Sequence, residues 1–216
     1  MPTPYANQTG ASKMLVATLV AGSPPLSEQL IEVVVSALRT AEANNISYKR
    51  VADKVVDVFF DGISIEHAYA VLRPVASAVQ IDVIVQLAEV RQKKFFIASM
   101  ESTIIEQEIM RELAEIADTT DKLWEIDRRA ASGELDFTRA LVECAKLLTG
   151  QPASVLEQAA ARITITPGAT ALVTNMKARG AQCWLVSGGF SYFTKYVAEQ
   201  VGFDQHYGTY LGVKDG

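Results

Sequence analysis

Residues 95–103 read Phe-Phe-Ile-Ala-Ser-Met-Glu-Ser-Thr. The apolar run 95–98 is followed at once by polar residues and then by a helical pattern, an order that predicts a buried strand opening into a helix. Ligands of parallel α/β sheets bind beyond the carboxyl ends of the strands. The polar residues from Ser99 onward are therefore the first candidates for a functional site.

A second stretch of this kind lies at 182–187, Gln-Cys-Trp-Leu-Val-Ser, and two glycines follow it. We predict a buried parallel strand here and then a helix over about 190–201. Exposed N–H groups at the start of a helix favour phosphate. Ser187 and the Gly188 amide, with the amides after Ser99, are therefore expected to form an anion-binding edge.

The segments between and after these two strands complete the pattern. Residues 104–161 are helical in spacing almost throughout and predict an all-α cap insertion. Residues 163–166 lead into a helix that is expected to run to about Arg179. A further strand is predicted at 209–213, and the Asp-Gly pair at 215–216 is a hairpin-turn signal.

The first part of the chain, residues 14–90, is predicted to form a separate domain. Apolar runs and alternating patterns predict strands, and helical spacing predicts two helices. The strands are expected at 14–20, 46–51, 54–60 and 81–87, and the helices at 26–43 and 64–78. The order βαββαβ is typical of a ferredoxin-like domain, in which two helices cover one face of an antiparallel sheet. ACT domains, which sense small molecules, are one version of this pattern, and Pro74 is a defect in its second helix.

Composition and charge limit the classes of partner. A net charge of -5 over 216 residues argues against nucleic acid or an anionic membrane as the main partner. No stretch offers the roughly 20 continuous apolar residues of a membrane span. The start of the chain has no signal-peptide run, and residues 1–13 are expected to be a disordered tail. We expect a cytoplasmic protein in which the charged residues 91–94 form a solvated linker.

The cysteines and histidines indicate no site of their own. Cys144 and Cys183 suit a reducing compartment, lack metal-ligand spacing and are expected to be buried as small apolar residues. His67 and His206 are isolated in the sequence and are expected to be surface or packing residues.

Five collinear segments together resemble the phosphoserine phosphatases of the haloacid dehalogenase-like superfamily. These segments are 95–103, 128–137, 147–152, 164–169 and 186–190. The resemblance covers roughly 94–216 and implies a Rossmannoid α/β core with an all-α cap of about 104–161. The domain at 14–87 fits the N-terminal domain that some of these proteins carry. We therefore expect an ACT-like domain over 14–90, followed by an incomplete haloacid dehalogenase-like core over 91–216.

The resemblance also implies roles for individual residues. In the family, an aspartate attacks phosphorus, forms an aspartyl-phosphate and binds Mg²⁺, and Ser99 stands at that position here. A second aspartate acts as general acid and base, and its backbone carbonyl touches the metal. Glu101 stands there, one methylene longer. Glu108, Ser187 and Gly188 occupy substrate-binding positions of the family pattern.

Several of these replacements weaken the chemistry that the resemblance implies. A hydroxyl is a poor nucleophile without a base beside it, and Mg²⁺ loses an anionic ligand at Ser99, so weak or absent Mg²⁺ binding is expected. The family's cap arginine corresponds to Val142, and Arg139, one turn earlier, is expected to be a solvated helix charge. The family's phosphate-binding lysine and its metal-binding loop are expected beyond residue 216.

The expected function is that of a phosphoserine phosphatase-like protein of serine biosynthesis, inactive as written and binding phosphoserine or phosphate weakly. Two alternatives stay open. One is a residual phosphomonoester hydrolase, and the other is a non-catalytic, amino-acid-binding or regulatory module at 14–87. In the family another strand lies beside the one at 95–99. Without it that strand has an open apolar edge, so we expect a homodimer or a completing partner chain.

Overall fold

The computed structural model describes residues 13–214 and 216, which form two compact units, one up to Gln92 and one from Lys93 onward. Residues 1–12 of the expected tail lie outside the described residues. Among residues 13–214, none of the helices combines the length and the apolar character that crossing a bilayer would require.

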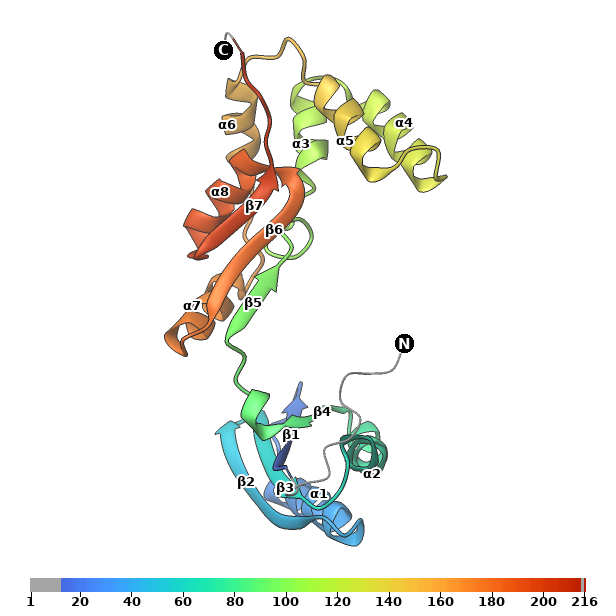
Figure 1. Ribbon diagram of the computed structural model, residues 1–216, viewed down its shortest axis with the longest axis vertical. Coiled ribbons are helices and arrows are strands. Elements are labelled where there is room, and N and C mark those ends of the chain that lie inside the picture. The colour runs from blue at the N-terminus through green and yellow to red at the C-terminus, as the bar shows by residue number, and fades with distance from the viewer. Residues whose placement is uncertain (1–12, 215) are drawn as a thin grey trace. The chain divides into compact units, whose positions relative to one another are not determined.

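The first unit is a four-stranded antiparallel sheet with two helices on one face (Figure 1). Its elements are β1 (Leu15–Ala21), α1 (Glu28–Thr40), β2 (Asn44–Ala52), β3 (Val55–Asp61), α2 (Ile65–Ala78), β4 (Ile81–Leu87) and the short 3-10 helix η1 (Ala88–Val90). The strand order is β2-β3-β1-β4. The predicted βαββαβ order with both helices on one face is confirmed.

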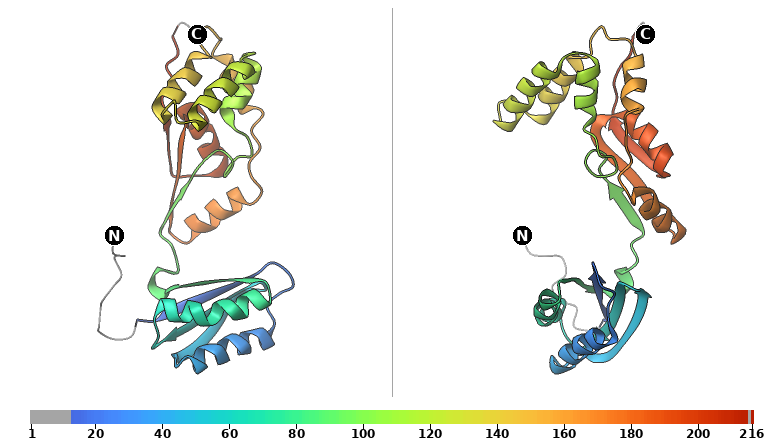
Figure 2. Two further views of the ribbon diagram at one scale, coloured as in Figure 1. Left: turned by 90° about the vertical axis from the view of Figure 1, so that its right-hand side faces the viewer. Right: turned by 180° about the vertical axis from the view of Figure 1, so that it is seen from behind.

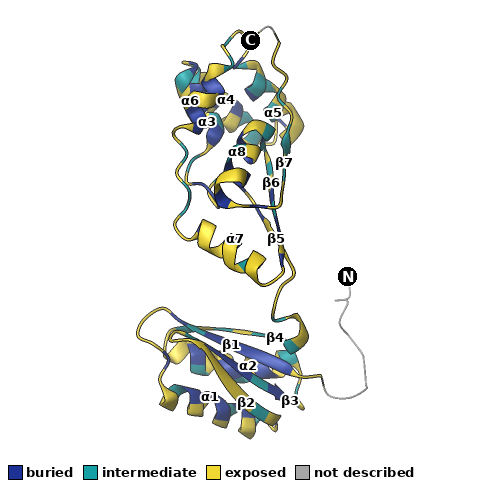
Figure 3. Cartoon of the chain, turned by 90° about the vertical axis from the view of Figure 1, so that its left-hand side faces the viewer, coloured by how far each residue is buried: buried dark blue, intermediate teal, exposed yellow. Residues whose placement is uncertain are grey.

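Every second residue of β1 and β3 is apolar and faces the helices, because successive side chains of a strand point to opposite faces of the sheet. One face of β1 and β3 packs on the helices through small and branched apolar residues. They are Leu15, Ala17, Leu19, Val56, Val58 and Phe60. Serine side chains cap both helices: Ser27 accepts from the Leu30 N–H and Ser64 from the His67 N–H. The helix α2 continues through Pro74 to Ala78. In Figure 3, β1 is largely buried and the edge strand β2 exposed.

The opposite face of this sheet holds a buried carboxylate. The Thr18 hydroxyl donates to Asp57 Oδ1 at 2.6 Å, and Arg91 Nε lies 3.1 Å from the same oxygen. The expectation of a solvated linker at 91–94 was wrong for Arg91, because a buried carboxylate needs a charged or hydrogen-bonding partner and this side chain provides one.

The second unit is built on a three-stranded parallel sheet of order β5-β6-β7. Helices α7 and α8 pack on one face of this sheet, while α4 and α5 form a hairpin that projects from the core (Figure 2). The elements are β5 (Phe95–Ala98), α3 (Ile109–Ile116), α4 (Thr120–Ala131), α5 (Phe137–Lys146), α6 (Ser154–Ala160), α7 (Ala169–Ala178), β6 (Gln182–Phe190), α8 (Ser191–Val201) and β7 (Gln205–Thr209). Parallel strands with helices between them agree with the predicted α/β class.

Two predicted boundaries in this unit were wrong. No helix begins directly after Thr103: the N–H groups of Thr103, Ile104 and Ile105 all donate to the Met100 carbonyl, and helix α3 begins at Ile109. The buried residue Ile105 bridges to Glu101 and Ile165 instead, which keeps this segment out of a helix.

The last strand lies at 205–209 instead of the predicted 209–213. Asp204 fixes its start, because its N–H donates to the Cys183 carbonyl and its carboxylate accepts from the Cys183 N–H. These two bonds set the register of β7 on β6.

The separate cores of the two units give the first prediction. Phe60 is fully buried in the first unit, so Phe60→Ala should lower that unit's free energy of unfolding by about 3–5 kcal/mol. Both tryptophans, Trp124 and Trp184, lie in the second unit. In urea titrations the far-UV circular dichroism should therefore show the first unit unfolding at a lower urea concentration, while the midpoint of the tryptophan fluorescence transition is unchanged. Tyr69→Ala, at an exposed position of α2, is the matched control and should shift neither signal. Equal shifts of both signals in Phe60→Ala would contradict separate cores.

Candidate functional site

The candidate site lies at the edge of the parallel sheet where β5 and β6 end. Pairing of β5 with β6 ends with Ala98 opposite Leu185, so Ser99 and Ser187 lie just past that point at the same edge of the sheet, although β6 itself continues to Phe190. Ser99 is exposed and Ser187 is half-buried. The end of β7 lies there too, since the Thr209 hydroxyl donates to the Gly188 carbonyl at 3.0 Å. The structure thus places the two predicted polar segments beside each other.

Glu101 is a half-buried carboxylate at this edge. Its Oε1 accepts from the Ile109 N–H, the first residue of α3, at 3.0 Å. A free N–H at a helix start is a favourable partner for a carboxylate. Burial raises the pKa of Glu101, and the nearby Glu108 carboxylate raises it further, although the Ile109 N–H acts in the opposite direction.

Glu108 lies at the N-cap position of α3 with its carboxylate exposed. The Ser102 hydroxyl donates to Glu108 Oε1. Ser102 has a φ of 52°, in the left-handed region that few residues other than glycine adopt. The turn between β5 and α3 thus brings two carboxylates, Glu101 and Glu108, to the start of one helix.

The glycine pair after Ser187 belongs to the strand and not to the helix that follows. The strand β6 continues through Phe190, with an irregularity in its pairing with β7, and α8 begins at Ser191. The expectation that the Gly188 amide stands at a helix start was wrong. The Ser187 hydroxyl is engaged locally, because it accepts from the Gly189 N–H at 2.9 Å.

Glu101 and Ser187 meet at Gly189. A methyl group placed on Gly189 would lie 3.2 Å from Ser187 Oγ and 3.6 Å from Glu101 Oε2. The second oxygen of Glu101 therefore points toward the polar end of β6, while the first holds α3.

Sequence reasoning missed the contribution of Phe137. This residue begins α5 and is 67% exposed, yet a methyl group on Gly188 would lie 2.6 Å from its Cζ. The α4–α5 hairpin thus touches the site through one aromatic ring resting on a glycine. The order Asp136-Phe137 could have indicated only a helix start: Asp136 caps α5 by accepting from the Arg139 N–H at 2.8 Å.

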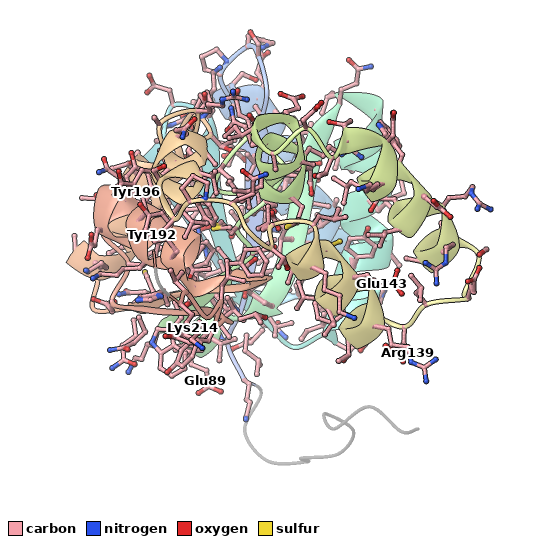
Figure 4. All side chains as sticks on the ribbon, turned by 90° about the horizontal axis from the view of Figure 1, so that it is seen from above. Glu89, Arg139, Glu143, Tyr192, Tyr196 and Lys214 are labelled. Carbon is pink, nitrogen blue, oxygen red and sulfur yellow. The ribbon has the colours of Figure 1, made fainter. Side chains whose placement is uncertain are left out.

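The predicted solvated charge at Arg139 is confirmed. Its side chain is 73% exposed, lies 3.6 Å from Asp136 and points outward from the hairpin (Figure 4). Val142 is half exposed on the same helix. The other sequence expectations about isolated residues also hold: Cys144 and Cys183 are buried and free, and half-buried His206 is hydrogen-bonded to Thr194 through Nδ1.

The described residues do not fit a magnesium site on their own. Ser99 offers a neutral hydroxyl, and one oxygen of Glu101 is occupied by the Ile109 N–H. Mg²⁺ favours carboxylate oxygens in octahedral geometry. Nowhere in the described part of the chain do three His, Cys, Asp or Glu side chains gather as a metal would need.

A parallel sheet with a polar edge, connecting helices and an inserted helical hairpin defines a Rossmann-like α/β core. A family model described as haloacid dehalogenase-like hydrolase matches residues 95–216. The chain belongs to the haloacid dehalogenase-like hydrolases.

Within that family the chain is similar to phosphoserine phosphatases. It is 39% identical to the phosphoserine phosphatase of Archaeoglobus fulgidus over 147 residues, which is 67% of this chain and 43% of the relative. It is 36% identical to the Lactococcus lactis phosphoserine phosphatase over 124 residues, 57% of each chain. The chain thus spans about half the length of the curated relatives it matches.

Solved structures agree with this fold. A phosphoserine phosphatase solved as a phospho-aspartyl intermediate analogue is 32% identical, with a TM-score of 0.53 over 58% of this chain and 60% of that one. A haloacid dehalogenase family hydrolase from Salmonella enterica serovar Typhi has a TM-score of 0.69 over 94% of this chain and 69% of that one. At 21% identity the second likeness concerns the fold alone.

The raised pKa of Glu101 predicts a pH-dependent effect of one substitution. A carboxyl whose pKa is higher in the folded state makes folding less favourable as pH rises from its unfolded pKa through its folded pKa. Glu101→Gln keeps an acceptor for the Ile109 N–H and removes the buried charge. We therefore expect the variant to be more stable than the parent at pH 7, with the difference shrinking as the pH falls toward the usual glutamate pKa of 4.5 and staying at its smallest below that pH.

Urea unfolding followed by tryptophan fluorescence at pH 7 and pH 4 measures this difference. Glu106→Gln, at an exposed carboxylate of the same turn, is the control and should show no such trend. A stability gain in Glu101→Gln that is equal at both pH values would argue against a buried charge as its cause.

Proposed function

We propose that this chain is a phosphoserine phosphatase-like protein that binds a phosphate monoester weakly at the β5–β6 edge and hydrolyses it no faster than background. The observation that carries this proposal is the hydroxyl of Ser99 at the end of β5. The resemblance places the nucleophilic aspartate at that position, and a related phosphoserine phosphatase has been solved as a phospho-aspartyl intermediate analogue.

The surroundings of Ser99 offer its hydroxyl no activation. A serine nucleophile needs an adjacent base to take its proton. Among the described residues, no His, Asp or Glu side chain is hydrogen-bonded to Ser99, and the nearest carboxylate in sequence, Glu101, is directed to Ile109 and Gly189. If phosphorus were transferred to Ser99, its hydrolysis would have to expel the serine alkoxide, a poorer leaving group than the carboxylate of an acyl phosphate, so turnover would stop at the phosphoserine adduct.

Charge at this edge also works against phosphoryl transfer. Phosphoryl transfer depends on positioning and on neutralising the charge of the transferred group. The charged group that acts on Glu101 is the carboxylate of Glu108, which is negative as well. Two carboxylates repel a phosphate dianion when no cation stands between them. The backbone N–H groups after Ser99 and around Gly188 support weak binding only.

Magnesium is the family's cofactor, and it would supply that cation when bound. In this chain the family positions are Ser99, which offers a neutral hydroxyl in place of the anionic ligand, and Glu101, whose position contributes a backbone carbonyl. We propose that Mg²⁺ binds weakly or not at all to the described residues, and that phosphate binding therefore gains little from it.

Hydrolysis of O-phosphoserine with Mg²⁺ tests the proposal directly. The parent chain and Ser99→Ala should release phosphate at the same rate, and that rate should equal the buffer background. Ser99→Asp restores an anionic acceptor and should raise phosphate release above the parent's. Folding of each variant is checked by circular dichroism.

Turnover by the parent well above that of Ser99→Ala would overturn the inactive assignment and favour a residual phosphomonoester hydrolase. A phosphorylated parent chain, detected by intact mass during multiple turnovers, would do the same. The family assignment does not depend on either result.

The first unit suggests a second function, because its strand order and one-sided helices are those of the ferredoxin-like pattern to which ACT domains belong. We propose that this unit is an ACT-like module, either regulatory or a spacer. Fold alone does not identify a ligand.

Titration calorimetry of the full chain with serine and a panel of other amino acids tests the regulatory form. A saturable heat of binding that is unchanged in Ser99→Ala would place the ligand away from the phosphatase-like edge and support a sensing module. Absence of heat across the panel would leave the spacer role as the supported one.

A further inference from the structure

A groove of about 390 Å³ lies on the α4–α5 hairpin, between the two helices (Figure 1). Sites for small ligands commonly enclose about 300–1,000 Å³, so the groove is large enough for a small metabolite. One continuous segment of the chain, residues 120–147, builds it. The α4 side is lined by Lys122, Glu125, Ile126 and Arg129, whose spacings of three and four residues place them on one side of the helix.

Packing and ion pairs fix the floor and one end of the groove. Ile126 is 6% exposed and, with the half-buried Leu147, forms an apolar floor. Arg129 joins α4 to α5, because its two terminal nitrogens donate to the two carboxylate oxygens of Glu143 at 2.7 and 3.4 Å. Its Nε donates to Glu134 at 2.7 Å. The charges of Arg129 and Glu143 are therefore already paired with each other.

Three other charged side chains of the groove have no such partner. Lys122 and Lys146 are exposed cations, and Glu125 is an exposed carboxylate. In the described part of the chain, none of these three side chains takes part in an ion pair or a hydrogen bond. Neighbours three residues apart on a helix often pair, but the Glu143 carboxylate, three residues before Lys146, is taken by Arg129. The groove thus presents two unpaired cations and one unpaired carboxylate.

The position of Lys122 favours an anion beside it. Lys122 lies in the first turn of α4, and Thr119 at the N-cap makes no side-chain hydrogen bond to the helix. The free N–H groups of a first turn carry partial positive charge, which disfavours a cation and favours an anion. Asp121, the acidic residue of this turn, does not line the groove. Because α4 and α5 run in opposite directions, Lys146 in the last turn of α5 lies at the same end.

We propose that this groove binds an acidic amino acid, glutamate or aspartate, as a second ligand site of the chain. The two carboxylates of the ligand contact Lys122 and Lys146, and its ammonium group contacts Glu125. Two anionic groups and one cation complement the charges that the groove leaves unpaired. The methylene groups of the ligand lie over the apolar floor at Ile126 and Leu147.

Ligands of simpler charge suit these side chains less well. A divalent cation would meet two ammonium groups, at Lys122 and Lys146, and inorganic phosphate would face the Glu125 carboxylate. A neutral ligand would leave all three charges without a partner. The presence of both signs is what selects an amino acid that carries a second carboxylate.

Titrating L-glutamate and, separately, L-aspartate into the isotope-labelled full chain tests the proposal through the chemical shifts of the backbone amides. The parent should show saturable shifts in α4 and α5, with a dissociation constant on the order of 1 mM because water screens the exposed charges. Lys122→Gln and Lys146→Gln each remove one carboxylate contact and should raise that constant about tenfold. Lys195→Gln, at an exposed position of α8, is the matched control and should leave it unchanged.

The substitution Glu125→Gln tests the ammonium contact. Loss of this carboxylate should weaken the binding of glutamate several-fold. It should strengthen the binding of glutarate, a dicarboxylate of the same length without the ammonium group, because a repulsion between carboxylates is removed. A change of the same sign for both ligands would contradict the contact assigned to Glu125.

Two outcomes would overturn the proposal as a whole. One is the absence of saturable shifts with either amino acid. The other is a set of shifts that Lys122→Gln and Lys146→Gln leave unchanged while circular dichroism shows both variants folded, which would place the ligand elsewhere, as in the first unit. Neither amino acid carries phosphate, so this inference and the proposed function at the β5–β6 edge fail independently.

Discussion

The hydrogen bond from the Ile109 N–H to Glu101 is the contact on which the rest of the site depends. It sets where α3 begins, and α3 in turn connects the sheet to the helical cap. Leu113 of α3 belongs to the core cluster around the sheet, and Ala114 belongs to the core cluster of the cap. The same bond fixes one oxygen of the carboxylate toward the helix. A side chain that could shuttle a proton is thereby also a structural cap, and its freedom to reorient is reduced.

The sheet edge explains why substitution at one position matters so much. The ends of β5, β6 and β7 bring Ser99, Ser187 and Thr209 to one edge of the sheet, where the proposed phosphate-binding site lies. The scaffold positions a hydroxyl where the family pattern has an anion. Because the backbone is set by buried residues such as Ala98 and Leu185, a serine at position 99 is compatible with the fold.

Much of the fold could be predicted from periodicity, and the failures have local physical causes. Alternation in β1 and β3 and helical spacing in α1 depend on a single buried face, which the sequence displays directly. The segment 104–108 looked helical because Ile104, Ile105 and Ile109 repeat at near-helical spacing, but Ile104 and Ile105 are buried and Ile105 bridges to Glu101 and Ile165. The ion pair of Arg91 with Asp57 joins residues 34 apart, and no local pattern could reveal it.

The candidate site was predictable residue by residue only where strands end. Ser99, Glu101 and Ser187 were found by that rule, whereas Phe137 comes from a helix about 40 residues further along than Ser99 and depends on how the hairpin folds back. The glycine pair was placed in the wrong element, because two glycines after an apolar run read as a strand end while the pairing with β7 extends the strand to Phe190.

The contact of the Phe137 ring with Gly188 has a consequence for the access of a ligand to this edge of the sheet. Because the Phe137 ring lies against the backbone of Gly188, access to the strand ends depends on the position of the α4–α5 hairpin. A side chain at position 188 would have to displace the Phe137 ring, and with it the start of α5. Gly188 is therefore the residue whose lack of a side chain allows the ring to lie this close to the backbone of β6.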